Sequence, residues 1–535
     1  MALGLWLRWM PPSHWLEAFT VDGHLEPATA RFADSCWIFA CIAGLVQCTA
    51  AWSRSFRAAL VGTVRGALPR GGTASGWVIA ALALATLVAR LLVSAWSDIG
   101  LGDDGARVAW LLRWLRDPEW VPRELWAPGH LYLHALVWLV VRDAVRAGIL
   151  LSALASAATV WLLGRAVQRE WGTQAGVLAA LLVGVLPVAS AHGATPDVNP
   201  VFACLCVAAV CCVVRAARGS SAWLLCAWVC VFFASWSRFE TFILAPAFAA
   251  PLWPHRWRAL VFLIACLLPA LAWGIAVQMA HGDALRMFRT LQVDPTLMRP
   301  LASRLFDLLW SAWLGVPLSV ALLGCLGALR SLHHRRGTEF LPLVCLHLCS
   351  LAAATWSTGT GNQPRYFILA GAIAAAYAGV ALAGASRTAR GWGTALLVAT
   401  LIGIPWTTAL FPHPGELWIR RLDRVRAVAD CVAAQRGGAN EPVVWIADEA
   451  GYFFLCREHV AIECYHAMPR AESDAGAILV ALHGQPTVLV CVRDNAESRR
   501  RWQAFLQIAS ASFTADSVET FCADYRLARL SRHDE

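Results

Sequence analysis

The sequence predicts a polytopic α-helical membrane protein with a soluble α/β domain after its last membrane span. The 535 residues are 58% hydrophobic and only 15% charged, and the mean hydropathy is +0.55, which lies outside the range of soluble domains. About twelve apolar runs approach the roughly 20 residues that cross a bilayer. After Phe411 the long apolar runs give way to short alternating ones.

The predicted spans divide the chain into three regions. Residues 1–75 are expected to form a surface segment, one extra span and a basic loop, 76–410 a transmembrane domain, and 411–535 the α/β domain. The opening MALGLWLRWMPPSHW lacks the sustained apolar core and the cleavage site of a signal peptide. The predicted spans are 36–52, 76–96, 147–164, 174–191, 198–214, 222–236, 239–253, 259–279, 306–329, 340–356, 366–385 and 392–410.

The charges of the loops predict the orientation. Short loops rich in arginine stay cytoplasmic, and alternate loops hold such clusters, for example Arg165 with Arg169 and Arg215 with Arg218. The intervening loops hold most of the acids and are expected to face outward, in the inner (plasma) membrane. The net charge of +9 therefore reflects orientation, and we expect no nucleic-acid partner. The outward acids are Asp98, Asp103, Asp104, Asp197, Glu240, Asp283 and Asp294.

The first outward loop, 97–146, has two short helical patterns. DDGARVAWLLRWLRD has an apolar face and scattered arginines, as expected for a helix that lies in the membrane interface. The second apolar stretch, 130–141, is too short to span and predicts a juxtamembrane or re-entrant helix. The two helices are expected to roof a cavity that a lipid-linked substrate could enter sideways.

Several motifs together resemble the GT-C superfamily of membrane glycosyltransferases, in particular bacterial relatives of protein O-mannosyltransferases and of the lipid A aminoarabinose transferase. The resemblance is carried by DD after a span, LWAPGHLYLHAL, LLGRAVQREWGTQAGVLAALLVGVLPV, HGATPDVN and SRFE. It covers residues 76–246 well and the rest by layout. It implies that 76–410 is a catalytic domain that transfers a sugar from a polyprenyl-phosphate carrier, usually with inversion, to a glycan, lipid or protein acceptor on the outer face.

The resemblance assigns the chemistry to Asp103 and Asp104. An inverting transfer needs a base for the acceptor hydroxyl, and neighbouring acids at a low-dielectric edge can raise each other's pKa towards the working pH. Asp103 is the expected general base, and Asp104 would orient the acceptor or tune its neighbour. The alternative role for both is to cap the helix that they open.

The departing phosphate needs positive charge, which planar arginine supplies well. Arg365 and Tyr366 resemble the family's Arg-Tyr element near the lipid phosphate, and Arg107, one turn after the acids, is a second candidate. The alternative for Arg365 is to reach the interface from the end of a span. Arg238 and Glu240 are candidate substrate ligands whose alternative is a simple ion pair at the membrane boundary.

Asp197 matches a position where relatives carry an acid, and it is expected to contact the sugar or to cap the following helix. His130 is a candidate for substrate binding, with a satisfied interfacial histidine as the alternative. No cofactor is certain. A divalent cation, Mg²⁺ or Mn²⁺, stays open as an alternative, with Asp103, Asp104 and Asp197 as its ligands.

The region after Phe411 reads as an outward α/β domain. VVWIAD, VAIECY and TVLVCVRD predict buried strands, RAESDAGAILVALHG and NAESRRRWQAFLQIAS predict helices, and residues 513–530 predict a hairpin. It has no phosphate-binding glycine motif, so a lid or a docking platform is expected. A Cys456–Cys464 bridge is one alternative in an oxidising compartment. The sequence has no CxxC pair with a matching histidine pair, so structural zinc is not expected.

Two other function classes remain open from the sequence. A transporter or lipid flippase would also have about twelve spans, with ionisable residues or broken helices near mid-membrane. The predicted spans hold few ionisable residues, with Arg90 as an exception. The third class is a scaffold in which the C-terminal domain carries the function.

Overall fold

The computed structural model describes the bundle and most of the C-terminal domain. The described residues are 20–21, 24–25, 74–97, 104–116, 118, 128–219, 222–238, 240–283, 301–358, 363–385, 422–438, 440–446, 465–467, 478–479, 482, 485–493, 496–515, 520–522 and 525–533. The predicted spans 36–52 and 392–410 and the cysteines 456 and 464 lie outside them. The first described elements are two short strands, β1 (Thr20–Val21) and β2 (His24–Leu25), which pair antiparallel.

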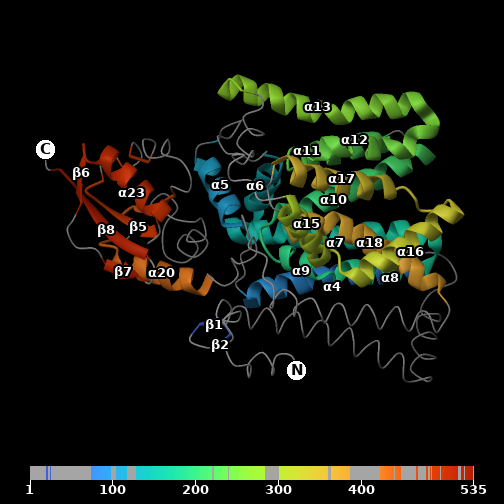
Figure 1. Ribbon diagram of the computed structural model, residues 1–535, viewed down its shortest axis with the longest axis horizontal. Coiled ribbons are helices and arrows are strands. Elements are labelled where there is room, and N and C mark those ends of the chain that lie inside the picture. The colour runs from blue at the N-terminus through green and yellow to red at the C-terminus, as the bar shows by residue number, and fades with distance from the viewer. Residues whose placement is uncertain are drawn as a thin grey trace.

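The protein has two parts, a helical bundle and a smaller sheet domain (Figure 1). Helices α5 and α6 lie between them in this view. The helices of the bundle are α4 (Ala74–Ser97), α5 (Asp104–Arg116), α6 (Gly129–Val141), α7 (Ala144–Trp171), α8 (Thr173–Gly184), α9 (Pro187–His192), α10 (Val198–Arg218), α11 (Ala222–Ser235), α12 (Thr241–Ala249), η2 (Ala250–His255), α13 (Arg256–His281), α15 (Leu301–Gly315), α16 (Leu318–His334), α17 (Leu341–Thr358), η4 (Pro364–Phe367) and α18 (Ile368–Gly384).

The bundle is that of a multi-pass membrane protein. Among the described residues, five helical segments are long and apolar enough to cross a membrane, or six if α15 and α16 count as one bent span. Four shorter apolar helices, including α6 and α8, accompany them. Large apolar side chains such as Leu84, Val140 and Met279 are exposed, as expected for surfaces that contact lipid. The five segments are Gly76–Ala95, Ala144–Trp171, Val198–Arg218, Thr241–Ala280 and Pro364–Gly384.

Two predicted spans are wrong as continuous helices. The stretch 306–329 is split into α15 and α16, which are bent by 80° at Val316 and Pro317, because proline cannot donate the next helical hydrogen bond. The stretch 174–191 is split into α8 and α9 ahead of Pro187. At this second break Arg90 donates a 2.6 Å hydrogen bond to the carbonyl of Gly184, which satisfies one of the freed backbone groups.

Small residues let the central helices approach closely. A Cβ added to Gly327 of α16 would lie 1.9 Å from the carbonyl oxygen of Tyr377 on α18, so only glycine fits at this crossing. A Cβ on Gly315, at the end of α15, would lie 2.5 Å from the Cβ of Phe367 in η4. Close backbone approach of this kind is typical of helices packed in membranes, and it fixes η4 against the bend between α15 and α16.

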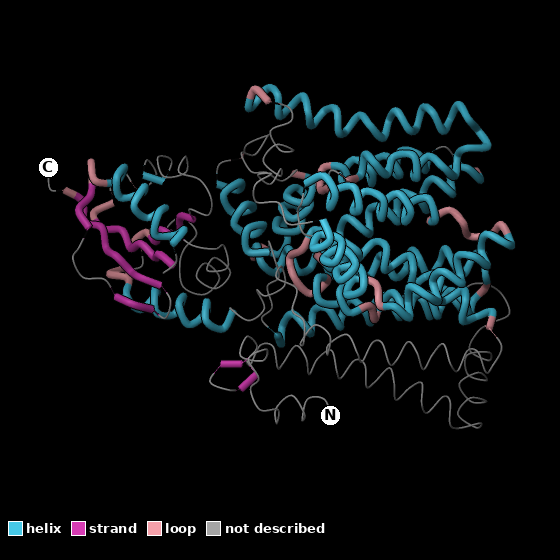
Figure 2. The backbone as a smooth tube through the Cα atoms, in the orientation of Figure 1, coloured by secondary structure: helices cyan, strands magenta, loops and turns pink. Residues whose placement is uncertain are grey.

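The C-terminal domain is the predicted α/β domain. Figure 2 shows its strands grouped apart from the helical bundle. The sheet has the order β4-β3-β5-β8-β6, with β7 also paired to β8. Strands β3, β4 and β5 are parallel, and β8 pairs antiparallel with its neighbours. The elements are α20 (Leu422–Gln435), β3 (Val443–Ile446), β4 (Tyr465–Ala467), β5 (Thr487–Arg493), α23 (Ala496–Ala509), β6 (Phe513–Ala515), β7 (Thr520–Cys522) and β8 (Tyr525–Arg532).

Apolar side chains that point in turn to opposite faces of this sheet form a core on each face. Val444 and Ile446 pack in a core with Phe505 of α23, whereas Val443 and Trp445 belong to the core on the other face. The side chains of a strand point to opposite faces in turn. Strand β4 overlaps the predicted strand 460–465 only at its first residue.

The second core also ties the domain to the bundle. Val108 and Leu111 of α5 belong to the same apolar cluster as Val428 of α20 and Trp445 of β3. The interfacial helix predicted in the first outward loop is therefore covered by the C-terminal domain. Cys431 of α20 is disulfide-bonded.

Candidate active site at the start of α10

Asp197 organises a buried hydrogen-bond network at the start of α10. It is the N-cap residue of α10: its Oδ1 accepts hydrogen bonds from the backbone N–H of Asn199 at 2.8 Å and from Asn199 Nδ2 at 2.7 Å. Its Oδ2 is bonded to Nδ1 of His192 at the end of α9. Both carboxylate oxygens of Asp197 are therefore engaged, and the residue is only 2% exposed.

The network continues from Asn199 to the loop between α11 and α12. Arg238 donates from Nη1 to Oδ1 of Asn199, and its Nη2 and Nε donate to the two oxygens of Glu240. This two-point contact is the strong geometry of an arginine and a carboxylate. We call these five residues, His192, Asp197, Asn199, Arg238 and Glu240, the Asp197 network.

The Arg365–Tyr366 pair of η4 reaches the same place from a distant part of the sequence. The guanidinium carbon of Arg238 lies 4.5 Å from the centroid of the Tyr366 ring, and that of Arg365 lies 5.5 Å from it, both in range of a cation–π contact. Arg365 is buried. His347 of α17 holds this turn through Nε2, which is 2.9 Å from the carbonyl oxygen of Tyr366.

The charges of the Asp197 network are stabilised in their ionised forms. Burial alone would raise the pKa of Asp197, but His192, Arg365 and the N–H of Asn199 outweigh it and lower that pKa below its ordinary value. Burial likewise opposes ionisation of Glu240, yet Arg238 lowers the pKa of this carboxyl. Because an effective general base needs a pKa near the working pH, both carboxylates are better suited to positioning and electrostatic roles.

Arg107, His130 and His134 form a second buried group beside the network, which we call the Arg107 group. Burial, Arg107 and His134 lower the pKa of His130 well below its ordinary value, while Asp197 raises it slightly. Burial lowers the pKa of His134 to about 4, and its Nε2 contacts the carbonyl oxygen of Ala144 at 2.6 Å. Nε2 of His130 is buried and has no hydrogen-bond partner within the described parts of the chain.

Two glycines hold the Arg107 group against the network. A Cβ on Gly148 of α7 would lie 2.5 Å from Cβ of Pro196 and 2.9 Å from Nε2 of His134. The N–H of Gly129, at the start of α6, donates a 2.5 Å hydrogen bond to the carbonyl of Trp236, two residues before Arg238. The loop that holds Arg238 therefore meets α6 directly, and the loop that holds Asp197 meets α7 next to His134.

The structure thus brings together most of the residues predicted from the sequence. Asp197, Arg238, Glu240, Arg365 and Tyr366 are in contact or linked through Asn199, and Arg107 and His130 lie next to them. The capping role of Asp197 and the ion pair of Arg238 with Glu240 are both present. Asp103 lies outside the described residues. Asp104 is the first residue of α5, and its side chain also lies outside what the structure describes.

Sequence reasoning placed His192 near the expected cavity, as an interfacial histidine, and did not place Asn199 or His347 in the site. The first two stand within HGATPDVN, so the motif that singled out Asp197 already held its two partners. His347 lies in an apolar run and had no such signal. Among the described residues no group of three or more His, Cys, Asp or Glu side chains has the arrangement of a metal site.

Residues 126–280 match the family of dolichyl-phosphate-mannose-protein mannosyltransferases. This segment begins just before α6 and ends in α13, so it includes every member of the Asp197 network. No protein with a curated description is significantly similar to the chain in sequence.

The fold is similar to solved membrane transferases at low sequence identity. ArnT from Cupriavidus metallidurans bound to undecaprenyl phosphate is 14% identical, with a TM-score of 0.57 over 86% of this chain and 98% of ArnT. The apo form of the same protein gives a TM-score of 0.53, with the same identity and coverage. An Archaeoglobus fulgidus oligosaccharyltransferase in complex with Zn and sulfate is 13% identical, with a TM-score of 0.46 over 78% of this chain and 67% of that protein. The chain therefore has the fold of ArnT, as the resemblance to GT-C enzymes predicted, and its mannosyltransferase-like segment contains the Asp197 network.

Proposed function

We propose that the protein is a glycosyltransferase that moves a sugar, with inversion, from a polyprenyl-phosphate carrier to an acceptor on the outer face of the membrane. The observation that carries this proposal is the meeting of Arg238, Arg365 and Asp197 beside His130, which also lies near Arg107 of α5. Such a site combines cations for a phosphate with fixed carboxylates, and it lies within a fold shared with a transferase whose structure contains undecaprenyl phosphate.

In the proposed reaction Asp103 accepts the proton of the acceptor hydroxyl. The hydroxyl oxygen then bonds to the anomeric carbon as the bond from that carbon to the phosphate oxygen breaks, and polyprenyl phosphate departs with the bonding electrons. Asp104, at the start of α5, orients the acceptor.

Arg365 stabilises the negative charge that develops on the departing phosphate. Its burial strengthens this interaction, because a charge excluded from water acts through a lower dielectric constant. The ring of Tyr366 holds Arg365 in place and also contacts Arg238. Glu240 keeps Arg238 paired, so that one buried guanidinium is neutralised while the other faces the donor.

Asp197 and His130 contact the sugar in this proposal, and Arg107 supports His130. The orphan Nε2 of His130 can bond a sugar hydroxyl. Both oxygens of Asp197 are engaged by His192 and Asn199, so a divalent cation would depend mainly on Asp103 and Asp104. Magnesium or manganese stays an alternative, which activity with and without EDTA would decide.

The C-terminal domain is proposed to dock the acceptor. Its core continues into α5, the helix that begins with Asp104, so an acceptor held by the domain would be close to the proposed base. The disulfide-bonded Cys431 supports an extracytoplasmic position for this domain, and hence for the active site.

The decisive experiment compares the wild type with Asp103→Asn in detergent, using labelled polyprenyl-phosphate sugars from a membrane lipid extract. We expect sugar transfer or release by the wild type and its loss in the variant, with normal folding. Asp430→Asn, exposed on α20, is the matched control. A well-folded Asp103→Asn protein with full activity would contradict the assignment of the base.

The runner-up function is that of a transporter or lipid flippase, and one observation favours it. The break between α8 and α9, with Arg90 at the freed carbonyl of Gly184, resembles the broken helices of transporters. Lipid movement across proteoliposomes without any covalent product, in a sample that retains its fold, would favour this class over the transferase.

A further inference from the structure

A cavity lies at the end of the bundle opposite the Asp197 network. Its volume is about 300 Å³, and it lies between the C-terminal ends of α7 and α10, the later turns of α18 and the connection from α16 to α17. Asp197 precedes the first residue of α10, whereas Arg215 of the cavity is near its last. The 21 residues of α10 span about 30 Å, the thickness of a bilayer core. The cavity is thus distinct from the candidate active site.

The walls of the cavity are apolar. They include Leu162, Ala208 and Ile373, which offer no hydrogen bonds to a water-soluble ligand. Trp161 and Trp223 also line it, and they are 40% and 37% exposed on the outside of the bundle. Leu154, two turns before Trp161 on α7, is 44% exposed. This face of α7 contacts lipid, so the cavity is accessible from the membrane.

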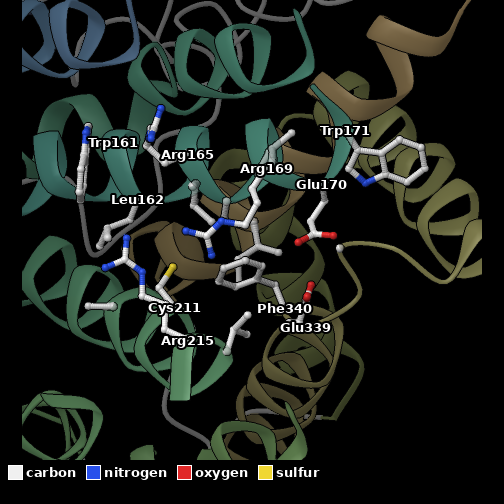
Figure 3. Close-up of a pocket in the computed structure, with 18 of the residues that line it drawn as sticks. Trp161, Leu162, Arg165, Arg169, Glu170, Trp171, Cys211, Arg215, Glu339 and Phe340 are labelled. Carbon is white, nitrogen blue, oxygen red and sulfur yellow. The ribbon is translucent and has the colours of Figure 1, made fainter. Parts of the chain in front are cut away.

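Three arginines, Arg165, Arg169 and Arg215, line the same cavity. Figure 3 shows the guanidinium groups of Arg169 and Arg215 on one side of the cavity, below Arg165, with the carboxylates of Glu170 and Glu339 on the other side. Arg165 bonds neutral Gln168 at 2.6 Å, and Arg215 lies 4.6 Å from the Trp223 ring. Within the described ranges none of these three arginines forms an ion pair.

The two carboxylates of the cavity are paired with an arginine that lies outside it. Nη2 of Arg218 lies 2.7 Å from Glu170 Oε1 and 3.3 Å from Glu339 Oε1, and Arg218 does not line the cavity. The three lining arginines therefore remain available for an anion. Arginines so close to hydrocarbon are stabilised by a negatively charged partner. The surrounding apolar walls are suited to a hydrocarbon chain.

We propose that this cavity binds an anionic phospholipid of the leaflet at the arginine-rich end, with one acyl chain between α7, α10 and α18 and the phosphate at Arg169 and Arg215. Arginine clusters next to membrane helices recognise anionic head groups in this way. The polyprenyl-phosphate donor of the proposed reaction acts at the other end of the bundle. Phospholipids are present in every leaflet and can enter the cavity sideways from the membrane.

The test measures lipid binding to the purified full-length protein in detergent by native mass spectrometry. Phosphatidylglycerol is the probe, phosphatidylcholine is the neutral reference, and undecaprenyl phosphate is the third lipid. We expect phosphatidylglycerol to bind at least tenfold more tightly than phosphatidylcholine, and this preference to weaken with salt. Equal binding of the two phospholipids would overturn the proposal. Undecaprenyl phosphate can also bind at the proposed active site, so only a loss of its binding in the Arg169→Gln, Arg215→Gln variant would overturn the assignment of this cavity to a phospholipid.

Two kinds of variant assign the binding to this cavity. Arg169→Gln with Arg215→Gln should reduce phosphatidylglycerol binding about tenfold or more, as loss of a charged contact does. Arg256→Gln with Arg258→Gln, on α13 and outside the cavity, removes the same charge and should change nothing. Ala208→Phe fills the cavity while keeping all charges and should also block binding. Unchanged binding in both the charge variant and the filled variant would refute the site, whatever the sugar-transfer assay shows.

Discussion

The imidazole of His192 is hydrogen-bonded to the carboxylate of Asp197, and both side chains are 2% exposed. The two residues come from different helices, the end of α9 and the cap of α10, so this bond closes the turn between them. The break that separates α8 from α9 places His192 where it can meet Asp197. The break in this membrane helix thus allows the contact at the centre of the site.

His192→Gln should destabilise the protein, because Asp197 would keep a buried charge with a weaker partner. The expected loss is about 1–3 kcal/mol of unfolding free energy, the cost of a poorly satisfied buried polar group. Thermal unfolding in detergent measures it, with His255→Gln, an exposed histidine of η2, as the control. Equal midpoints for the two variants would show that this bond does not support the fold.

Arg238 and Glu240 should depend on each other. Their side chains are 12% and 24% exposed, so removing one partner should cost about 1–3 kcal/mol because the other charge is left poorly compensated, whereas replacing both with apolar residues should cost less. We therefore expect Glu240→Gln and Arg238→Met to lower stability more than Arg238→Met combined with Glu240→Leu. Unfolding midpoints of the three variants test this coupling, and additive losses would contradict it.

The fold class and most helices could be predicted from apolar run length, but the breaks could not. Pro187 starts a new helix and Pro317 stands at the 80° bend, whereas Pro246 and Pro269 lie inside the continuous helices α12 and α13. A proline therefore identifies a possible break and not an actual one. The outcome depends on distant partners, such as Arg90 at the Gly184 carbonyl, which sequence periodicity does not show.

The candidate site was predicted as single residues and not as a network. Asp197, Arg238 and Arg365 each stood out as charges beside apolar spans, and the structure brings them together. Their connection runs through Asn199, whose polar side chain at a helix start reads from the sequence as an ordinary turn residue. Contacts between residues 199 and 238 arise from helix packing, which a single sequence does not specify.

His134 should make the fold sensitive to mild acid. Its pKa is lowered to about 4 in the folded protein, against about 6.5 when unfolded. Folding thus favours the neutral form of His134. The contribution of this residue to the stability of the fold is complete above pH 6.5 and is lost as the pH falls towards 4. Between pH 7 and pH 5 we expect a loss of about 2 kcal/mol. His134→Gln should be less sensitive over this range, and an identical pH dependence in the variant would contradict the buried neutral state.

Gly148 should be intolerant of even one methyl group. A Cβ there would lie 2.5 Å from Pro196 Cβ, and overpacking of this kind costs about 1–3 kcal/mol. Gly274 is also within a helix, but a Cβ there meets nothing within 4 Å, so Gly274→Ala should stabilise by about 0.5–1 kcal/mol. Opposite shifts of the unfolding midpoint are expected, and a stabilised Gly148→Ala protein would show that α7 does not press on the Asp197 loop.

Arg365 should act mainly on the transition state of the proposed sugar transfer. Loss of a preorganised charge at the departing phosphate lowers kcat by about 10²–10³-fold, because the charge on the leaving oxygen grows as the bond breaks. Arg365→Gln should therefore lose kcat more than it raises KM for the donor, and Arg365→Lys should recover part of the rate. Tyr366→Phe keeps the aromatic ring beneath both guanidinium groups and should stay close to the wild type. An increase in KM alone would contradict this prediction, because it would mean that Arg365 binds the donor equally well in the ground state and in the transition state. The leaving group would then have to be stabilised by another cation, with Arg238 and Arg107 as the candidates.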